Sequence, residues 1–324
     1  MSFPTNYFLA AFFGALTTSW VALPFWRKWC LRTSLLDDPG HRKIHATPVP
    51  LAGGFAVLTG ILLPIIAGAL LLKFQIIKTS SAAMLHGLDR RTGELIVLAL
   101  GAIAITVLGW MDDKHELKAM PKFLGQFLIA VAVAIACKRI TLFVHSEIFS
   151  YAITILWLLT IINAFNFMDN MNGLCAGVGA LGAFFFALIA AAKGEYLVAI
   201  TGFLMAGALA GFLPWNFPHA RAFLGDAGSH LVGYLLAVMG ILPHFYTHLE
   251  PRPLAVLAPL LVLAIPLLDL AQVSVFRTLK HQPFWIGDTN HLSHRLTRLG
   301  FSRTRAVLLL WLATAVLGTL ATRL

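Results

Sequence analysis

Apolar residues fall in ten long runs that polar stretches separate. The runs cover residues 6–26, 51–72, 93–110, 122–137, 149–165, 174–192, 196–213, 229–245, 253–276 and 304–322. A helix that crosses a bilayer needs about 20 mostly apolar residues. The pattern therefore predicts an all-α fold, a polytopic membrane helix bundle of about ten transmembrane helices. It also predicts a single integral-membrane domain over residues 1–324.

The composition excludes an ordinary soluble protein. Of the 324 residues, 59% are hydrophobic and 12% are charged, whereas a soluble domain carries about 25% charged residues. The net charge of +10 would suggest nucleic acid in a soluble protein, but Lys and Arg in membrane loops explain it better here. We therefore expect no nucleic-acid partner. The three cysteines lack the spacing of a disulfide framework or a zinc site.

The polar stretches that follow the odd-numbered runs differ from the others in charge. They hold 15 of the 24 Lys and Arg residues. Because short loops rich in Lys and Arg stay in the cytoplasm, this side is predicted to be cytoplasmic and both termini to lie outside. The same loops hold eight of the 14 carboxylates. Membrane topology does not require those carboxylates, so we expect them to serve a site.

Two adjacent carboxylates, Asp112 and Asp113, end the third run in the sequence GWMDDK. Neighbouring side chains on a helix point about 100° apart. The two therefore either meet one ligand at a helix end or do separate jobs. An isolated pair of this kind is more often a solvated helix end, with Lys114 as its counter-ion.

Carboxamides crowd the end of the fifth run in the sequence NAFNFMDNMNG, residues 163–173. On a continuous helix Asn163, Asn166 and Asn170 would share one face, close to Asp169. Polar groups at membrane depth need partners or a water-filled cavity. Asn residues also join neighbouring helices by hydrogen bonds, but that role alone does not account for so dense a group.

A glycine-flanked carboxylate, Asp226, stands in FLGDAGS, residues 223–229, before the eighth run. Glycine allows close approach of the backbone, and a helix N-terminus offers free N–H groups to a phosphate. Asp226 could then hold a divalent cation against that phosphate. Taken alone, an ordinary helix cap is the simpler interpretation.

Two loops combine imidazole and basic groups. The first is DDPGHRKIH, residues 37–45, and the second is DTNHLSHR, residues 288–295. His and Arg suit phosphate oxygens, and Arg can bind them through two hydrogen bonds. The alternative for the first loop is contact with lipid headgroups. Asp269, inside the ninth run, either supports the site from behind or pairs with a neighbouring helix.

These five segments all fall on the predicted cytoplasmic side. Carboxylates and carboxamides make a hard-oxygen site, which suits Mg²⁺, or Mn²⁺ as the alternative ion, better than zinc. Carboxylates, a divalent cation and cationic side chains are the components of phosphoryl transfer. In a membrane this combination predicts at least one lipid phosphate substrate.

With these motifs in this order, the chain resembles the polyprenyl-phosphate N-acetylhexosamine-1-phosphate transferases of glycosyltransferase family 4. Its DDPxxRKxHxxPVPxxGG stretch, residues 37–54, is similar to the undecaprenyl-phosphate GlcNAc-1-phosphate transferase branch rather than to the MurNAc-pentapeptide branch. Two motifs depart from the family pattern. Residues 169–173 read DNMNG where the branch usually has DGxDG, and residues 291–294 read HLSH where the family has HxHH.

The resemblance implies a reaction and its partners. A UDP-N-acetylhexosamine, GlcNAc above all, would give its sugar 1-phosphate to undecaprenyl phosphate, releasing UMP and starting a lipid-linked cell-surface polysaccharide. It also implies Mg²⁺, a bacterial cytoplasmic (inner) membrane and a homodimer. We expect catalytic roles for Asp112, Asp113 and Asp169, and metal binding by Asp226 and Asp112. The expected substrate contacts come from Arg42, Lys43, His45, Asn166, Asn172, His291, His294 and Arg295.

Two other functions fit parts of the pattern. A transporter or flippase of a lipid-linked or anionic substrate would predict broken helices, paired repeats and charges near mid-membrane. The charges here lie almost entirely at run ends on one side, which favours a site at the membrane surface. A lipid-phosphate hydrolase could use the same carboxylates with water as acceptor. It would release free phosphate rather than UMP.

Overall fold

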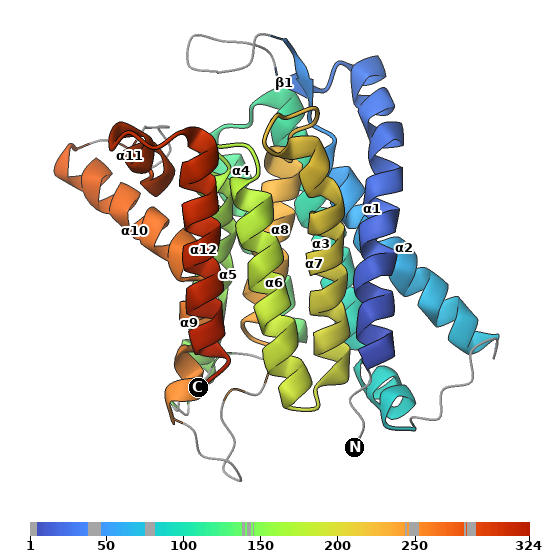
Figure 1. Cartoon of the computed structure of the whole chain (residues 1–324). Helices are drawn as coiled ribbons and strands as arrows, with labels where there is room; N and C mark the ends of the chain where they lie inside the picture. The colour runs from blue at the N-terminus through green and yellow to red at the C-terminus, as the bar shows by residue number, and fades with distance from the viewer. Residues whose placement is uncertain are drawn as a thin grey trace.

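The protein is an almost entirely helical bundle (Figure 1). The computed structural model describes residues 5–37, 47–74, 82–137, 140, 144, 146–243, 245, 253–281, 283 and 290–324. Two short strands, β1 (Leu36–Asp37) and β2 (Val49–Pro50), pair in antiparallel orientation and form what we term the β1–β2 hairpin. The helices are α1 (Thr5–Thr33), α2 (Gly53–Lys73), α3 (Ala82–His115), α4 (Ala119–Ala136), α5 (Glu147–Met168), α6 (Leu174–Ala192), α7 (Tyr196–Asn216), α8 (Gly225–Met239), the 3₁₀ turn η1 (Pro253–Leu257), α9 (Ala258–Val262), α10 (Ala264–Leu279), α11 (Leu292–Arg298) and α12 (Arg303–Ala321).

The apolar runs form membrane-length helices, so the predicted all-α membrane bundle is confirmed. Within the described ranges, eight helices are long and apolar enough to cross a membrane, and the bent pair of α9 and α10 raises the number to nine. The difference from the ten predicted runs is α8, which has only 15 residues. At 1.5 Å per residue it spans about 22 Å, less than the roughly 30 Å of a bilayer core.

The helices differ in how much of their surface other helices cover. The apolar windows of α6 and α7 are 78% and 67% buried, whereas that of α1 is 22% buried. Every residue of α8 from Ala227 to Met239 is buried. The short α8 is therefore enclosed by the bundle, while α1 and other outer helices present apolar side chains outward, as a lipid environment requires.

The predicted run 253–276 is two helices rather than one straight span. The axes of the pair differ by 72°, with the break at Leu263 between α9 and α10. Pro266 lies in the first turn of α10. Proline has no backbone N–H, so it cannot donate back to α9 and instead suits the start of a new helix.

The two ends of the bundle carry different features. The β1–β2 hairpin and α11 lie at the upper end of the view, where α3 and α5 finish and α8 starts (Figure 1). Helix α1 begins and α12 finishes at the lower end. Among the described residues, the segments expected to share one side therefore meet at one end, opposite the ends of α1 and α12.

Candidate active site

Close backbone packing brings the two glycines at the end of the residue 37–54 stretch against the FLGDAGS segment. The N–H groups of Gly53 and Gly54 donate to the carbonyls of Phe223 (2.9 Å) and Leu224 (3.0 Å). A Cβ atom at Gly54 would stand 2.5 Å from the backbone nitrogen of Gly228. Only glycine permits this approach, so the GG pair fixes the start of α2 against the FLGDAGS segment.

Asp113 caps α8 across 113 residues of chain. Its Oδ1 accepts the N–H of Asp226 at 2.7 Å, and its Oδ2 accepts the N–H of Ala227 at 3.0 Å. A carboxylate satisfies the free N–H groups of a helix N-terminus and its positive dipole end. A Cβ atom at Gly109 would collide with the carbonyl of Asp226. The GWMDDK glycine therefore lets α3 approach closely enough for this cap.

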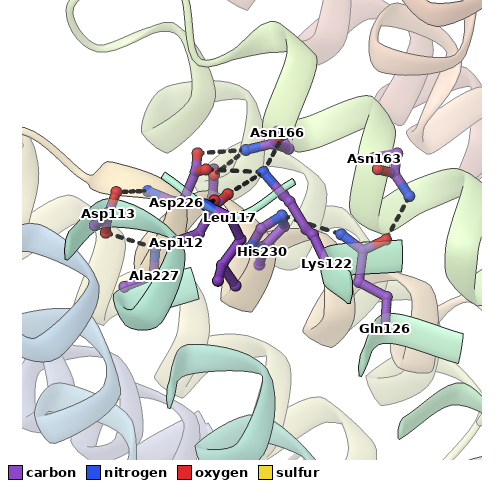
Figure 2. Close-up of polar contacts among 11 residues, drawn as sticks. Asp112, Asp113, Leu117, Lys122, Gln126, Asn163, Asn166, Asp226, Ala227 and His230 are labelled. Carbon is purple, nitrogen blue, oxygen red and sulfur yellow. Dashed lines mark hydrogen bonds and ion pairs between the residues drawn. The ribbon is translucent and has the colours of Figure 1, made fainter. Parts of the chain in front are cut away.

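Asp112, Lys122, Asn166 and Asp226 form what we term the carboxylate cluster (Figure 2). The Lys122 Nζ lies 2.5 Å from Asp112 Oδ2, 2.8 Å from Asp226 Oδ2 and 3.4 Å from Asn166 Oδ1. The Asn166 amide also donates to Asp226 Oδ1 at 2.6 Å and to Ser229 Oγ at 3.1 Å. Side chains from four helices thus meet at one ammonium group.

Polar contacts continue from this cluster into the bundle. Asn163 donates to Gln126 Oε1 at 2.8 Å, and Gln126 Nε2 lies 3.1 Å from His230 Nε2 (Figure 2). Gln126 and His230 are buried. The predicted alternative for Asn163, hydrogen bonding between helices, is therefore realised. This row supports the cluster from within the membrane-spanning part.

Residues His291–Arg295, here termed the imidazole segment, are anchored to α10. Asp269 Oδ2 lies 2.7 Å from His291 Nδ1, and Asp269 Oδ1 accepts the N–H of Leu292 at 2.6 Å. Both Asp269 and His291 are buried. Arg295, which is exposed, donates to Gln272 Oε1 at 2.7 Å. Asp269 was expected either to support the site from behind or to pair with a neighbouring helix. It does both, because its partner His291 belongs to the imidazole segment.

The end of α5 departs from the sequence expectation. The helix stops at Met168, so Asn170 does not continue the face of Asn163 and Asn166. The N–H of Asp169 turns back to the carbonyl of Asn166 at 3.3 Å, which closes the helix. Asn170 accepts instead from Ser293 Oγ at 2.6 Å. Because α5 ends at Met168, Asn170 can link the NAFNFMDNMNG segment to the imidazole segment.

Two groups outside the membrane-spanning helices titrate unusually. Burial, and then the nearby negative charge of Asp226, raise the pKa of Asp169 to about 7. Burial, and then the neighbouring His291 and the positive charges of Arg303 and Arg298, lower the pKa of His294 below its ordinary value. The lowered pKa favours the uncharged imidazole, which can donate one hydrogen bond and accept another.

The cluster offers the donors that a divalent ion prefers. The Lys122 ammonium occupies the place of a cation between two carboxylates and a carboxamide oxygen. No three His, Cys, Asp or Glu side chains gather as metal ligands within the part of the chain that the structure describes. Mg²⁺ usually takes only one or two carboxylates and completes its shell with water and substrate phosphates. The residues present therefore fit Mg²⁺.

The remaining predicted residues are placed as follows. Asn172 donates to the carbonyl of Pro218 at 3.1 Å and so joins the loop before α8. Arg42, Lys43 and His45 lie outside the described residues, and their roles stay predictions. Sequence reasoning missed Lys122, Gln126, His230 and Gln272. A signal for Lys122 was available, because a lysine opens the fourth apolar run on the side that holds the carboxylates.

The chain is similar in sequence to a known family and to several known proteins. Residues 95–244 match the model of glycosyl transferase family 4. The decaprenyl-phosphate N-acetylglucosaminephosphotransferase of Mycobacterium tuberculosis is 33% identical over 313 residues, 89% of this chain and 75% of that protein. The undecaprenyl-phosphate alpha-N-acetylglucosaminyl 1-phosphate transferase of Salmonella typhi is 27% identical over 306 residues, 90% of this chain and 77% of that protein.

Proposed function

Because the chain belongs to the polyprenyl-phosphate N-acetylhexosamine-1-phosphate transferases of glycosyl transferase family 4, we propose that it transfers N-acetylglucosamine 1-phosphate from UDP-GlcNAc to undecaprenyl phosphate. A phosphate oxygen of the lipid attacks the β-phosphorus of the donor. The bond from that phosphorus to the bridging oxygen breaks, and UMP leaves with the bridging oxygen. The product is a polyprenyl-diphosphate sugar.

One observation carries the proposal most directly. Asp112, Asn166 and Asp226 come from three motifs far apart in sequence, and all three contact the Lys122 ammonium. Oxygen ligands beside a fixed positive charge are what the transfer of a phosphoryl group between two anions requires. The cluster lies at helix ends, where a water-soluble donor and a lipid acceptor can both approach.

Asp112, Asp226 and the Asn166 carbonyl oxygen are the proposed ligands of Mg²⁺. When bound, the ion would neutralise the charge that develops on the donor diphosphate. Lys122 holds the two carboxylates together and contributes a further positive charge to the site. The second pKa of a phosphate monoester is about 6, so the acceptor is largely a dianion at pH 7. Positioning can therefore supply much of the acceleration without a strong base.

The two neighbouring aspartates receive different roles. Both oxygens of Asp113 accept backbone N–H groups of α8, which supports a positioning role rather than proton transfer. Asp112 Oδ2 faces Lys122, and this supports a place beside the substrates. Asp113 thus holds the N-terminus of α8, and with it Asp226, in front of Asp112.

The imidazole segment is the proposed contact for the donor. His294 and Arg295 can hydrogen-bond the diphosphate or the uridine, and Asp269 holds His291 in place. Arg42, Lys43 and His45 are proposed to contact either phosphate. We further propose that the site faces the cytoplasm at a bacterial inner membrane, with both termini outside, and that the enzyme is a homodimer.

The break between α9 and α10 is a feature that the transporter hypothesis also predicts. Asp269, six residues beyond that break, is buried. It bonds to His291 and Leu292 of the segment beside α11. The break therefore serves to bring α10 under the imidazole segment, which favours the transferase.

The proposed function is tested by tracing the β-phosphorus of the donor to its product. The purified protein in detergent receives MgCl₂, undecaprenyl phosphate and UDP-GlcNAc labelled at the β-phosphate. The proposal predicts lipid-dependent release of UMP and transfer of the label to the lipid. Unlabelled free phosphate released from undecaprenyl phosphate, with the label left in UDP-GlcNAc, would instead indicate a lipid-phosphate hydrolase. Neither product from folded protein, with any UDP-aminosugar, would contradict the proposal and favour a transporter.

A further inference from the structure

A partly buried hydrogen bond joins the loop after α5 to the start of α11. Ser293 Oγ donates to Asn170 Oδ1 at 2.6 Å, across 123 residues of chain. Ser293 is 1% exposed. One partner follows Asp169 directly, and the other lies between His291 and His294. The contact therefore couples the loop after α5 to the imidazole segment.

Asn170 is held from its own side. Its side-chain amide donates to the carbonyl of Phe167 at 3.1 Å, and its backbone N–H donates to the carbonyl of Met168 at 2.8 Å. These bonds fix the amide so that its oxygen faces Ser293. The acceptor is thus in place whether or not the imidazole segment is bound to it.

The two partners stand where the chain departs from the pattern of its family. The pattern DGxDG has glycine at the position of Asn170, and HxHH has histidine at the position of Ser293. Glycine leaves space for a large neighbour, whereas Asn fills that space and leaves room for a small one. Because protein interiors are close-packed, such exchanges are tolerated when the total volume is kept. The two departures from the family pattern therefore contact each other in this chain.

We propose that the Asn170–Ser293 hydrogen bond is a positioning pair that sets the imidazole segment against the Asp169 loop and thereby controls binding of the nucleotide-sugar donor. This inference rests on the proposed function. The donor is the relevant substrate because His294 and Arg295 of the imidazole segment are its proposed contacts.

The pair can be removed without releasing the whole segment. Asp269 still holds His291 and Leu292, and Gln272 still holds Arg295. Loss of the Ser293 hydroxyl therefore shifts the segment rather than unfolding it. A buried hydrogen bond contributes on the order of a fivefold to tenfold change in an equilibrium constant, and this is the expected size of the effect.

The experiment is a double-mutant cycle in the UMP-release assay, with Ser293→Ala, Asn170→Ala and the double variant. We expect each single variant to raise KM for UDP-GlcNAc about fivefold. The value of kcat and KM for undecaprenyl phosphate should stay within about twofold. The double variant should be no worse than the worse single, because both remove one interaction. The pattern-restoring pair Asn170→Gly with Ser293→His should bind the donor better than either of its single substitutions.

Thr297→Val provides the matched control. The Thr297 hydroxyl donates to the carbonyl of His294 at 2.8 Å within α11 and does not reach the loop after α5. It should leave KM for the donor unchanged. Unchanged donor KM in Ser293→Ala, or additive effects in the double variant, would overturn the inference while the proposed function stands. A wild-type protein that releases no UMP would overturn both.

Discussion

The carboxylate cluster and the imidazole segment lie at the same end of the molecule but are built differently. In the cluster, side chains from four helices contact one another directly around Lys122. In the imidazole segment, three side chains each hydrogen-bond to a different residue outside the segment. The pairs are His291 with Asp269, Ser293 with Asn170, and Arg295 with Gln272. The His291 and His294 rings are 6.1 Å apart between centroids.

Because they are built differently, the two regions should respond differently to substitution. The cluster depends on helix packing that glycines make close, such as Gly54 against Gly228, so its geometry is fixed when the bundle is folded. The segment depends on single hydrogen bonds at its edges. Substitutions in the cluster should therefore alter the chemical step, and substitutions around the segment should alter substrate binding.

The largest expected effect is in the cluster. Asp226→Asn removes a charge that faces Lys122 and the proposed Mg²⁺, and UMP release should fall roughly 100-fold to 1,000-fold. Glu116→Gln, an exposed carboxylate just after α3, should leave the rate near that of the wild type. Equal losses in the two variants would show that general surface charge, rather than the cluster, controls the rate.

A second test separates the cation of the cluster from its carboxylates. Lys122→Met leaves two carboxylates facing each other without a counter-charge, so the rate should fall by about tenfold or more. MgCl₂ should raise the apparent melting temperature of this variant more than that of the wild type, because the ion binds the vacated carboxylates. Lys118→Met changes an exposed lysine and should respond like the wild type. An absent Mg²⁺ response in Lys122→Met would contradict the assignment.

A third test asks whether Asp113 differs from Asp112. Asp113→Asn weakens the cap of α8 and should cost about 1–2 kcal/mol of stability, seen as a lower apparent melting temperature. Ser302→Ala removes an exposed cap, in which Ser302 Oγ accepts the N–H of Arg305 at 3.3 Å, and should cost less. A melting temperature of Asp113→Asn equal to that of the wild type would remove the positioning role.

A fourth expected effect appears as a gradual change with pH. The pKa of Asp169 is raised to about 7 in the folded protein, whereas an unfolded Asp titrates near 3.9. The folded state therefore holds this proton more tightly, and stability falls as pH rises from about 4 to 7. Asp169→Asn should flatten that part of the melting-temperature profile. An identical profile in the variant would assign the dependence to other groups.

The long apolar runs predicted most of the membrane-length helices, and the alternation of the polar stretches between them predicted that the motifs meet at one end of the bundle. The runs could not predict the 72° break or the enclosed position of α8, because both depend on packing rather than on local composition. The candidate site followed from carboxylates and carboxamides placed at run ends. Asp112, Asn166 and Asp226 meet there as expected from their chemistry.

What the sequence could not supply is the pairing between distant residues. Lys122 and Asp226 are 104 residues apart, and the sequence does not show which carboxylates this lysine contacts. The same holds for Asn170 and Ser293, which appeared only as two separate departures from a family pattern. The sequence left open whether Asp112 and Asp113 share one ligand or do separate jobs, and the structure shows that both Asp113 oxygens accept backbone N–H groups of α8. Such roles become visible only when the helices are assembled.

The most direct test of the division between the two regions is steady-state kinetics of UMP release for Asp226→Asn and His294→Ala, with both substrates varied. The account predicts that Asp226→Asn lowers kcat and leaves the two KM values close to those of the wild type. It predicts that His294→Ala raises KM for UDP-GlcNAc and largely keeps kcat. A loss of kcat in His294→Ala at saturating donor, together with a change of KM alone in Asp226→Asn, would contradict it.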